Sequence, residues 1–478
     1  MSRRSTPSLV LLLAALLPAC APQTPEGTDG ASSLSPAAYP ETAPEAAKLS
    51  ALCSWPLVSD PDVLNVLLPD EAATYWLAAL PNLPGTRLRI EGQYPKARYF
   101  SFNAYSPLLA SVDVLTDYQI APLQAGSNPY RDPDATPGAN YVAYVLPEPA
   151  PEEGQRQPNA LYSGNFPVAL GVEIPANPLQ ILVYRIYLAE GDLTGGVPLP
   201  TLTVETSDGS QALMKLDMVG CTPLIPPGVL PDLISETMRT QSLPAALTPL
   251  FEAVPLPVSS TEPTMQVSYG LPETVRANFS TSLGFDIPGQ SITSTVGANL
   301  ANNLDNAYMQ AILSRDKGSM YLIRGRAPEA ATIPAEAPLG EAQLRYWSLC
   351  TNEILTQRFT DCLYDAQVPL DTEGYFTVVV SDPDQRPVNA VAENGIGWLA
   401  WGALYPDATL LYRHMLPAPG FAQAIQNIPL NTPPESVMGE YYPLLAYCDR
   451  ATVEAAGSSA AAVFAACQAR HGGSPLPE

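Results

Sequence analysis

Short runs of apolar residues recur along the chain and are separated by Gly, Pro, Asn and Asp. Arg87–Ile90 and Met320–Arg324 lie between glycines, while Tyr141–Val145 and Phe376–Val380 are rich in β-branched and aromatic residues. Each run has the length of a strand, about four to eight residues, and is bounded by turn residues. Strands and helices do not alternate along the chain, so parallel βαβ units are not expected. The pattern predicts a mainly β protein of antiparallel β-sandwiches, with the jelly roll as one possible form and only minor helices.

The pattern also repeats within the chain. Four residues recur in the same order and with the same spacing: Tyr75, Gly85, Gly92 and Pro95, then Tyr308, Gly318, Gly325 and Pro328. The apolar runs Ile181–Leu188 and Trp398–Leu404 follow at the end of each copy. Self-similarity of this kind indicates a repeated structural unit. We therefore expect two homologous β-domains.

This repeat divides the chain into segments. We expect a signal peptide at 1–19, a lipidated tether at 20–50, the first β-domain at 51–221, a Pro-rich connector with a helix at 222–300, the second β-domain at 301–425 and a helical tail at 426–478.

The N-terminus carries the features of an exported protein. Arg3 and Arg4 precede an apolar run, Leu9–Leu17, that is too short to span a bilayer. The residues before Cys20 resemble a bacterial lipobox, so Cys20 is the predicted site of lipidation and the new N-terminus. Ordinary cleavage after Ala21 is the alternative. The segment after Cys20 is rich in Ala, Pro, Ser, Thr and Gly, which suits a tether. We expect the protein on the outer face of a bacterial membrane, periplasmic or at the cell surface.

The net charge limits the partners. The chain has a formal charge of −24, which becomes −26 when Arg3 and Arg4 leave with the signal peptide. Nucleic acid needs a basic surface, so it is not an expected partner. The same charge disfavours docking on anionic lipid, which leaves membrane attachment to the lipid anchor.

Six cysteines remain in the body of the protein, and none forms a C-x-x-C motif. In an oxidising compartment an even number favours disulfides. Cys350 and Cys362 align with Asn103 and Val114, so the first copy lacks both together. We expect three bonds: Cys53–Cys221, Cys350–Cys362 and Cys448–Cys467. Free buried thiols are the alternative.

The chain has little catalytic equipment. It has two histidines, His414 and His471, so a site with several His ligands for zinc is excluded, and no metal site is expected. No nucleophile elbow, P-loop or dinucleotide motif is present. We interpret His414 as a structural or surface residue and identify no catalytic residues. Three Asp-Pro-Asp triplets could contribute to calcium sites, but Asp-Pro commonly starts turns, so we expect no cofactor: Asp60–Asp62, Asp132–Asp134 and Asp382–Asp384.

Charged residues are repeated as well. Arg98 is followed by Asp117, and Arg345 by Asp365, at nearly the same distance along the chain. We predict a buried structural ion pair within each copy, Arg98–Asp117 and Arg345–Asp365. The functional alternative is a polar site that recognises a carboxylate or a sugar. Trp347, Trp398 and Trp401 could stack on a sugar, although core packing is the simpler interpretation.

Five segments together resemble an uncharacterised family of secreted bacterial proteins with duplicated β-domains of unknown function: Ala73–Trp76, Lys96–Phe102, Asn303–Tyr308, Arg345–Cys350 and Tyr412–Pro417. The resemblance implies no substrate and no catalytic residue. His414 departs from it, because a small polar residue is expected at that position.

These observations predict an extracytoplasmic lipoprotein with a binding or structural role at the bacterial cell envelope. A carbohydrate or envelope polymer is a candidate partner, and the oligomeric state is left open. The alternative function is a hydrolase that attacks such a polymer through two carboxylates.

Overall fold

The computed structural model describes most of the chain after the expected tether. The described residues are 54–59, 69–107, 110–132, 134–135, 138–167, 173–174, 177–216, 264–268, 303–315, 317–331, 342–353, 359–402, 407–429 and 432–471. Residues 50–478 form one compact unit. Cys20, Cys53, Cys221, the triplet Asp60–Asp62 and the expected helix of the connector lie outside the described residues.

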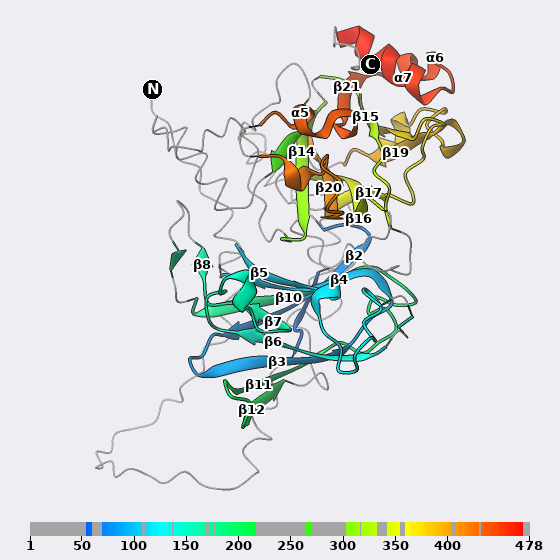
Figure 1. Cartoon of the computed structure of the whole chain (residues 1–478). Coiled ribbons are helices and arrows are strands. Elements are labelled where there is room, and N and C mark those ends of the chain that lie inside the picture. The colour runs from blue at the N-terminus through cyan, green and yellow to red at the C-terminus, as the bar shows by residue number, and fades with distance from the viewer. Residues whose placement is uncertain are drawn as a thin grey trace, which may run out of the picture. The chain divides into compact units, whose positions relative to one another are not determined.

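The first half of this unit contains two five-stranded sheets. One has the order β1-β2-β10-β4-β5: Leu57–Ser59, Ala73–Pro81, Leu179–Ala189, Ala97–Tyr105 and Ser111–Thr116. The other has the order β12-β11-β3-β6-β7: Ala212–Leu216, Thr201–Thr206, Thr86–Gln93, Asn140–Leu146 and Ala160–Tyr162. Figure 1 shows β4 and β10 in one layer and β6, β3 and β11 in the other. β8 (Phe166–Pro167) pairs antiparallel with β9 (Glu173–Ile174).

The second half, drawn from lime to red in Figure 1, contains a five-stranded and a four-stranded sheet. The first has the order β13-β14-β20-β16-β17: Gln266–Ser268, Asn306–Ser314, Asp407–Pro417, Leu344–Glu353 and Phe359–Tyr364. The second has the order β19-β18-β15-β21: Ile396–Ala400, Tyr375–Ser381, Met320–Arg326 and Leu444–Cys448. The expectation of a mainly β, mainly antiparallel protein is confirmed. One edge pairing in each half is parallel, β6 with β7 and β18 with β19.

The two halves share strand order and register. Tyr75 of β2 lies opposite Arg185 of β10, and Tyr308 of β14 lies opposite Arg413 of β20. The residues of the repeat therefore occupy the same places on corresponding strands. One sequence match is wrong: Ile181–Leu188 lies in β10, whose counterpart is β20, whereas Trp398 lies in β19. The runs are similar in apolar character and length, and only hydrogen-bond pairing separates an inner strand from an edge strand.

The second half extends beyond its expected bounds of 301–425. β13 pairs with β14, although its residues fall in the expected connector. β21 pairs with β15, although its residues fall in the expected tail. Both strands were missed because they are only three and five residues long. Strands of so few residues show little periodic signal, and they pair with segments that are distant along the chain.

Close packing explains one glycine of the repeat. Gly92 lies opposite Tyr141 in the sheet, and Gly325 lies opposite Phe376. A Cβ atom at Gly92 would collide with the Tyr141 ring, and one at Gly325 would lie 3.0 Å from the Phe376 Cζ atom. Both halves thus fold an aromatic ring over a glycine of the neighbouring strand, which requires glycine at that spacing.

The α-helices among the described residues are short and lie in the second half. They are α5 (Pro434–Met438), α6 (Arg450–Ala455) and α7 (Ala460–His471). α7 lies in the segment expected to be a helical tail, and the Cys448–Cys467 disulfide joins it to β21. None of the described helices combines the length and apolar character needed to cross a membrane.

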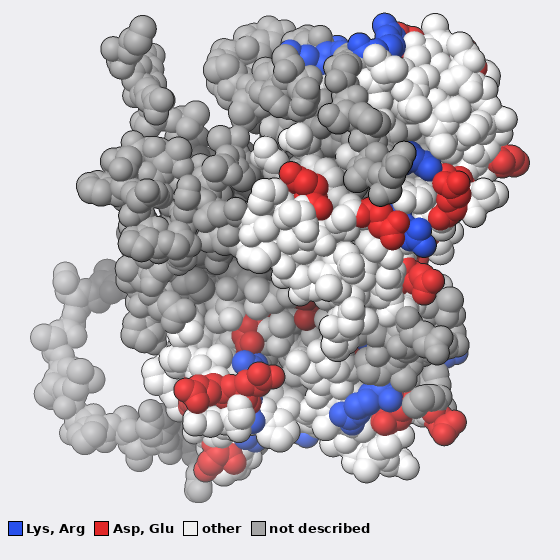
Figure 2. Space-filling view, turned by 45° about the horizontal axis from the view of Figure 1, so that its top comes forward, with Lys and Arg blue, Asp and Glu red and all other residues white. Residues whose placement is uncertain are grey.

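Charged side chains are sparse among the described residues of the face shown in Figure 2. On the face shown in Figure 2 they occur in small groups, several of which contain both signs, separated by uncharged residues. Many of the arginines are instead buried: Arg98, Arg185, Arg324, Arg345 and Arg413. The unusual electrostatic feature of this protein is therefore the number of charged side chains in its interior.

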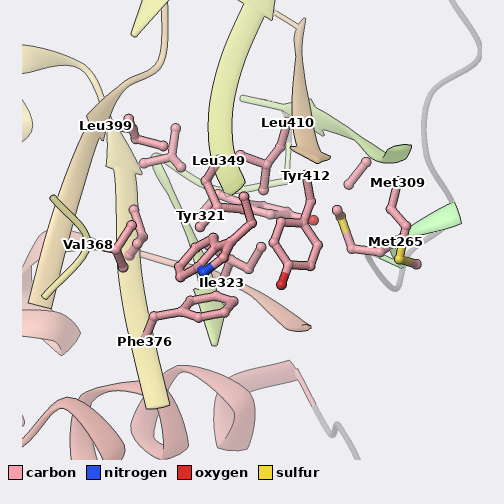
Figure 3. Packing of buried hydrophobic residues seen from close by; sticks show 14 of the residues in the cluster. Met265, Met309, Tyr321, Ile323, Leu349, Val368, Phe376, Leu399, Leu410 and Tyr412 are labelled. Carbon is pink, nitrogen blue, oxygen red and sulfur yellow. The ribbon is translucent and has the colours of Figure 1, made fainter. Parts of the chain in front are cut away.

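Each half has its own hydrophobic core. In the first half Phe100 and Phe102 of β4 pack with Tyr184 of β10. In the second half Figure 3 shows the rings of Tyr321, Phe376 and Tyr412 among aliphatic side chains. Met265, just before β13, belongs to this core, so the residues around β13 are part of the folded second half.

Candidate functional site

A polar layer joins the two halves. All nine residues of β4 are buried, because Phe100 and Phe102 face the first core while Tyr99 reaches the second half. Tyr99 donates to Asp305 across 2.7 Å and accepts from Asn303 across 2.9 Å. In return, Tyr346 of β16 donates to Asp70 across 2.7 Å. Corresponding tyrosines of the two halves thus make reciprocal contacts.

The four repeated charges lie in this layer, but their pairing differs from the expectation. Arg98 bonds to Asp365 at 2.5 Å, and Arg345 bonds to Asp117 at 3.2 Å. Both ion pairs therefore cross between the halves, and the predicted pairing within each copy is wrong. Each aspartate lies at nearly the same number of residues after the arginine of its own copy, and a backbone contact within that copy explains this spacing. Asp117 accepts from the backbone N–H of Phe100, and Asp365 from that of Trp347, two residues after the arginine in each copy.

The Arg345–Asp117 pair is sealed from solvent. The side chains of Arg345 and Asp117 are 1% and 0% exposed. Arg345 also donates to the backbone carbonyl of Arg98 at 3.1 Å. Burial raises the pKa of Asp117 to about 6, against the opposing effects of Arg345 and the backbone N–H groups of Phe100 and Tyr118. Such a pair cannot contact a ligand without opening the fold.

The Arg98–Asp365 pair borders a pocket. The side chains of Arg98 and Asp365 are 3% and 6% exposed. Both line a pocket of about 430 Å³, which is within the usual range for small-molecule sites. Burial raises the pKa of Asp365, and the guanidinium of Arg98 opposes that shift. Both contacts of Arg98 with the two Asp365 oxygens are made by Nη1, at 2.6 and 2.5 Å.

Neighbouring residues explain why one pair is fully enclosed and the other borders a pocket. Tyr94, one residue before Pro95, is fully buried and donates to the carbonyl of Ile120. The corresponding position before Pro328 is Ala327, which lines the pocket. The segment from Asp117 to Asn140 is also longer than the one from Asp365 to Tyr375. The longer segment contributes buried Tyr130, which packs against Phe100 and donates to Pro95.

Polar groups surround the rest of the pocket. Gln343 accepts from the backbone of Glu329 and donates to the hydroxyl of Tyr441. Arg326 forms a half-exposed pair with Glu440 at 3.4 Å. The apolar part of the lining includes Pro328, Ala330 and Leu370, of which Leu370 is well exposed. The pocket is therefore lined by both hydrogen-bonding groups and hydrocarbon.

A third buried ion pair was not predicted from the sequence. Arg413 bonds to Asp70 at 2.7 Å, and both side chains are essentially unexposed. Asp70 also accepts from Ser348 at 2.6 Å. Asn303 occupies the place before β14 that Asp70 occupies before β2, five residues ahead of the repeated tyrosine. Arg185 and Arg413 lie opposite the repeated tyrosines Tyr75 and Tyr308, and this repeated arginine is the signal that could have indicated an ion pair here.

His414 has a structural environment. It is fully buried and packs edge-on against Tyr412, with ring centroids 4.7 Å apart. Its Nδ1 atom accepts from the backbone N–H of Ile425. Burial lowers its pKa to about 3, so the ring is neutral at physiological pH. It does not line the pocket.

The structure contains the disulfides Cys350–Cys362 and Cys448–Cys467. Cys350 lies directly opposite Cys362 on β16 and β17, as Asn103 lies opposite Val114 on β4 and β5. Ligand atoms of Asp70, Cys350 and Cys362 come within 4.8 Å of one another. Because the two sulfurs are bonded to each other, they are not available as the thiolates a metal would need.

The Asp-Pro-Asp triplets within the described residues use their first carboxylate locally. Asp132 accepts from the backbone N–H of Asn128, and Asp382 pairs with Arg315 at 2.5 Å. A 3-10 turn begins directly after Asp382. Trp347 and Trp401 are buried in the second core, and Trp398 packs beside Arg386. Of these three tryptophans, Trp347 borders the pocket.

Comparisons with known proteins bring no function. No family model matches the chain, and no curated protein matches it. Among solved structures, an uncharacterised protein from Burkholderia cenocepacia has 12% identity and a TM-score of 0.43, with 84% of each chain covered. The VPA0106 protein from Vibrio parahaemolyticus has 9% identity and a TM-score of 0.37, with 80% of this chain and 90% of that chain covered. These neighbours are bacterial, and at such scores neither one informs the fold or the function of this protein.

Proposed function

We propose that this protein is a ligand-binding lipoprotein of the bacterial cell envelope, with its binding site in the pocket beside Arg98 and Asp365. One observation carries the proposal: Arg345–Asp117 is fully buried, whereas the equivalent pair Arg98–Asp365 borders a pocket beside Ala327. A purely structural pair would gain nothing from an opening, because water access weakens its electrostatics.

A duplication of one β-domain underlies this arrangement in our proposal. The matching strand orders and the repeated Tyr, Gly, Pro, Arg and Asp support it. After duplication, one copy could keep a closed structural pair while the other acquired an accessible one. The small side chain at Ala327 and the shorter segment after Asp365 support this difference between the copies.

The place of action in this proposal rests on the N-terminal sequence. Cys20 would be acylated, which would hold the protein on the outer face of a membrane. Mass spectrometry of the membrane fraction should find a diacylglyceryl cysteine at the mature N-terminus. An unmodified N-terminus at Pro22 would contradict the anchor.

The pocket is tested by refilling it. Ala327→Tyr restores at the open site the kind of side chain that seals the other one. Thermal-shift screening of the mature protein against sugars, lipids and metal ions should identify a ligand that raises the melting temperature. This shift should vanish in Ala327→Tyr and persist in the control Leu123→Tyr, which adds a tyrosine at an exposed site of the first half. A shift that survives in Ala327→Tyr would contradict this site.

A hydrolase is the second candidate, because Glu329 and Asp365 place two carboxylates in one pocket. Burial also raises the pKa of Asp365, as a general acid requires. A hydrolase would release product from a polymer, and Glu329→Gln would abolish that release while ligand binding persists. Bound polymer that stays intact with the wild-type protein would exclude this candidate.

A further inference from the structure

The charges around the pocket are balanced. Its lining contains two arginines, Arg98 and Arg326, and two carboxylates, Asp365 and Glu329. Arg98 is already paired with Asp365, and Arg326 with Glu440 at the rim. The protein as a whole has a formal charge of −24. An anion would therefore meet no excess of positive charge at the site and a repulsive field around it.

Two of the lining residues, Arg98 and Asp365, are nevertheless strong hydrogen-bonding groups. Asp365 is an acceptor, and Arg98 is a donor whose hydrogen bonds within the described residues are made through Nη1. A donor and an acceptor held side by side by a buried ion pair suit two neighbouring hydroxyl groups. Charge-assisted hydrogen bonds of this kind are stronger than neutral ones.

Other residues of the lining are apolar. Pro328, Ala330 and Leu370 present hydrocarbon, and half-buried Tyr441 adds an aromatic ring whose hydroxyl is held by Gln343. A ligand that suits this mixed lining needs both hydroxyl groups and C–H surface. A pyranose ring has this distribution, whereas an aliphatic chain lacks the hydroxyls and a small inorganic ion lacks the C–H face.

We propose that the pocket takes a neutral sugar unit, with Asp365 and Arg98 contacting two adjacent hydroxyls and Leu370 and Pro328 packing against the ring. This inference rests on the proposed function, because it specifies the ligand of the same pocket. It also identifies Ala327 as a specificity-determining position, since a larger side chain there would remove the space for the ring.

The test is a glycan array of neutral and acidic oligosaccharides probed with the mature protein, Ala327→Tyr and the control Leu123→Tyr. The wild type and the control should bind neutral glycans, and Ala327→Tyr should lose at least tenfold in affinity. Affinity for the best neutral glycan should change less than about twofold between 0.05 and 0.5 M salt, because no net charge is paired on binding.

The other outcomes separate this inference from the proposed function. Binding of acidic glycans alone, with affinity that falls as salt rises, would overturn the neutral ligand. Absence of any glycan binding, together with another ligand whose thermal shift is lost in Ala327→Tyr, would overturn the sugar and leave the pocket as a binding site. Glycan binding that is equal in Ala327→Tyr and the wild type would overturn both.

Discussion

The two halves of this protein place the same charged residues in different surroundings. Arg345 and Asp117 are enclosed where Tyr94 and Tyr130 fill the first half, whereas Arg98 and Asp365 border a pocket where Ala327 takes the place of Tyr94. The backbone contact of each aspartate is the same. This comparison indicates that the side chains around an ion pair, and not the pair itself, decide whether a ligand can reach the pair.

The sealed pair should be the more sensitive of the two to loss of its acid. Asp117→Ala leaves Arg345 charged and buried, which should cost about 3–5 kcal/mol of unfolding free energy. Asp365→Ala should cost less, because water can enter the pocket and solvate Arg98. Urea unfolding of both variants gives the comparison. Replacing Arg345 and Asp117 together by Met and Leu should be milder than Asp117→Ala, and equal costs for the two Ala variants would contradict the distinction between sealed and open.

The disulfide is a second difference between the halves. The double variant Cys350→Asn, Cys362→Val gives β16 and β17 the residues that β4 and β5 have at Asn103 and Val114. It should lose about 3 kcal/mol, because the unfolded chain is no longer cross-linked. Urea unfolding under non-reducing conditions measures the loss. A variant as stable as the wild type would show that the bond contributes little to the second half.

Acid should act on the second half through His414. Its pKa is about 6.5 in the unfolded chain and about 3 in the fold, so the unfolded chain binds a proton first as the pH falls. The contribution of neutral His414 is present above pH 6.5 and is lost toward pH 3, at about 1.4 kcal/mol per pH unit. His414→Gln should remove this slope between pH 6 and pH 4, measured by urea unfolding at each pH. Asp117 acts with the opposite sign in part of this window, because its pKa is raised in the fold, so the difference between variant and wild type is the quantity to compare.

The smallest expected effect on stability is that of Ala327→Tyr. The new ring enters a pocket and replaces no buried side chain, so the free energy of unfolding should change by less than about 1 kcal/mol. Thermal unfolding without ligand measures this directly. A loss of several kcal/mol would mean that the pocket cannot accept the ring. The two halves would then differ in more than the side chain at the position of Tyr94 and Ala327.

Much of the fold could be predicted from residue pattern. Strands at Tyr141–Leu146 and Tyr375–Ser381 follow from β-branched and aromatic residues between turn residues. The repeated Gly92 and Gly325 reflect a ring packed across a neighbouring strand. The short strands β13 and β21 could not be found in this way, because so few residues show no period and their place depends on a sheet edge formed by distant segments.

Residue pattern alone was enough to predict the β class, the repeat and the four charges that form the two ion pairs. Only the tertiary structure decided which acid meets which arginine, since spacing along the chain is the same whether Asp365 pairs with Arg345 or with Arg98. Because of the strand register, each aspartate accepts a hydrogen bond from a backbone N–H of its own copy. Packing of the two halves brings each arginine to the aspartate of the other half. The accessibility of the pocket was likewise decided in three dimensions, because it depends on Ala327 and on the length of a segment that closes only one of two equivalent spaces.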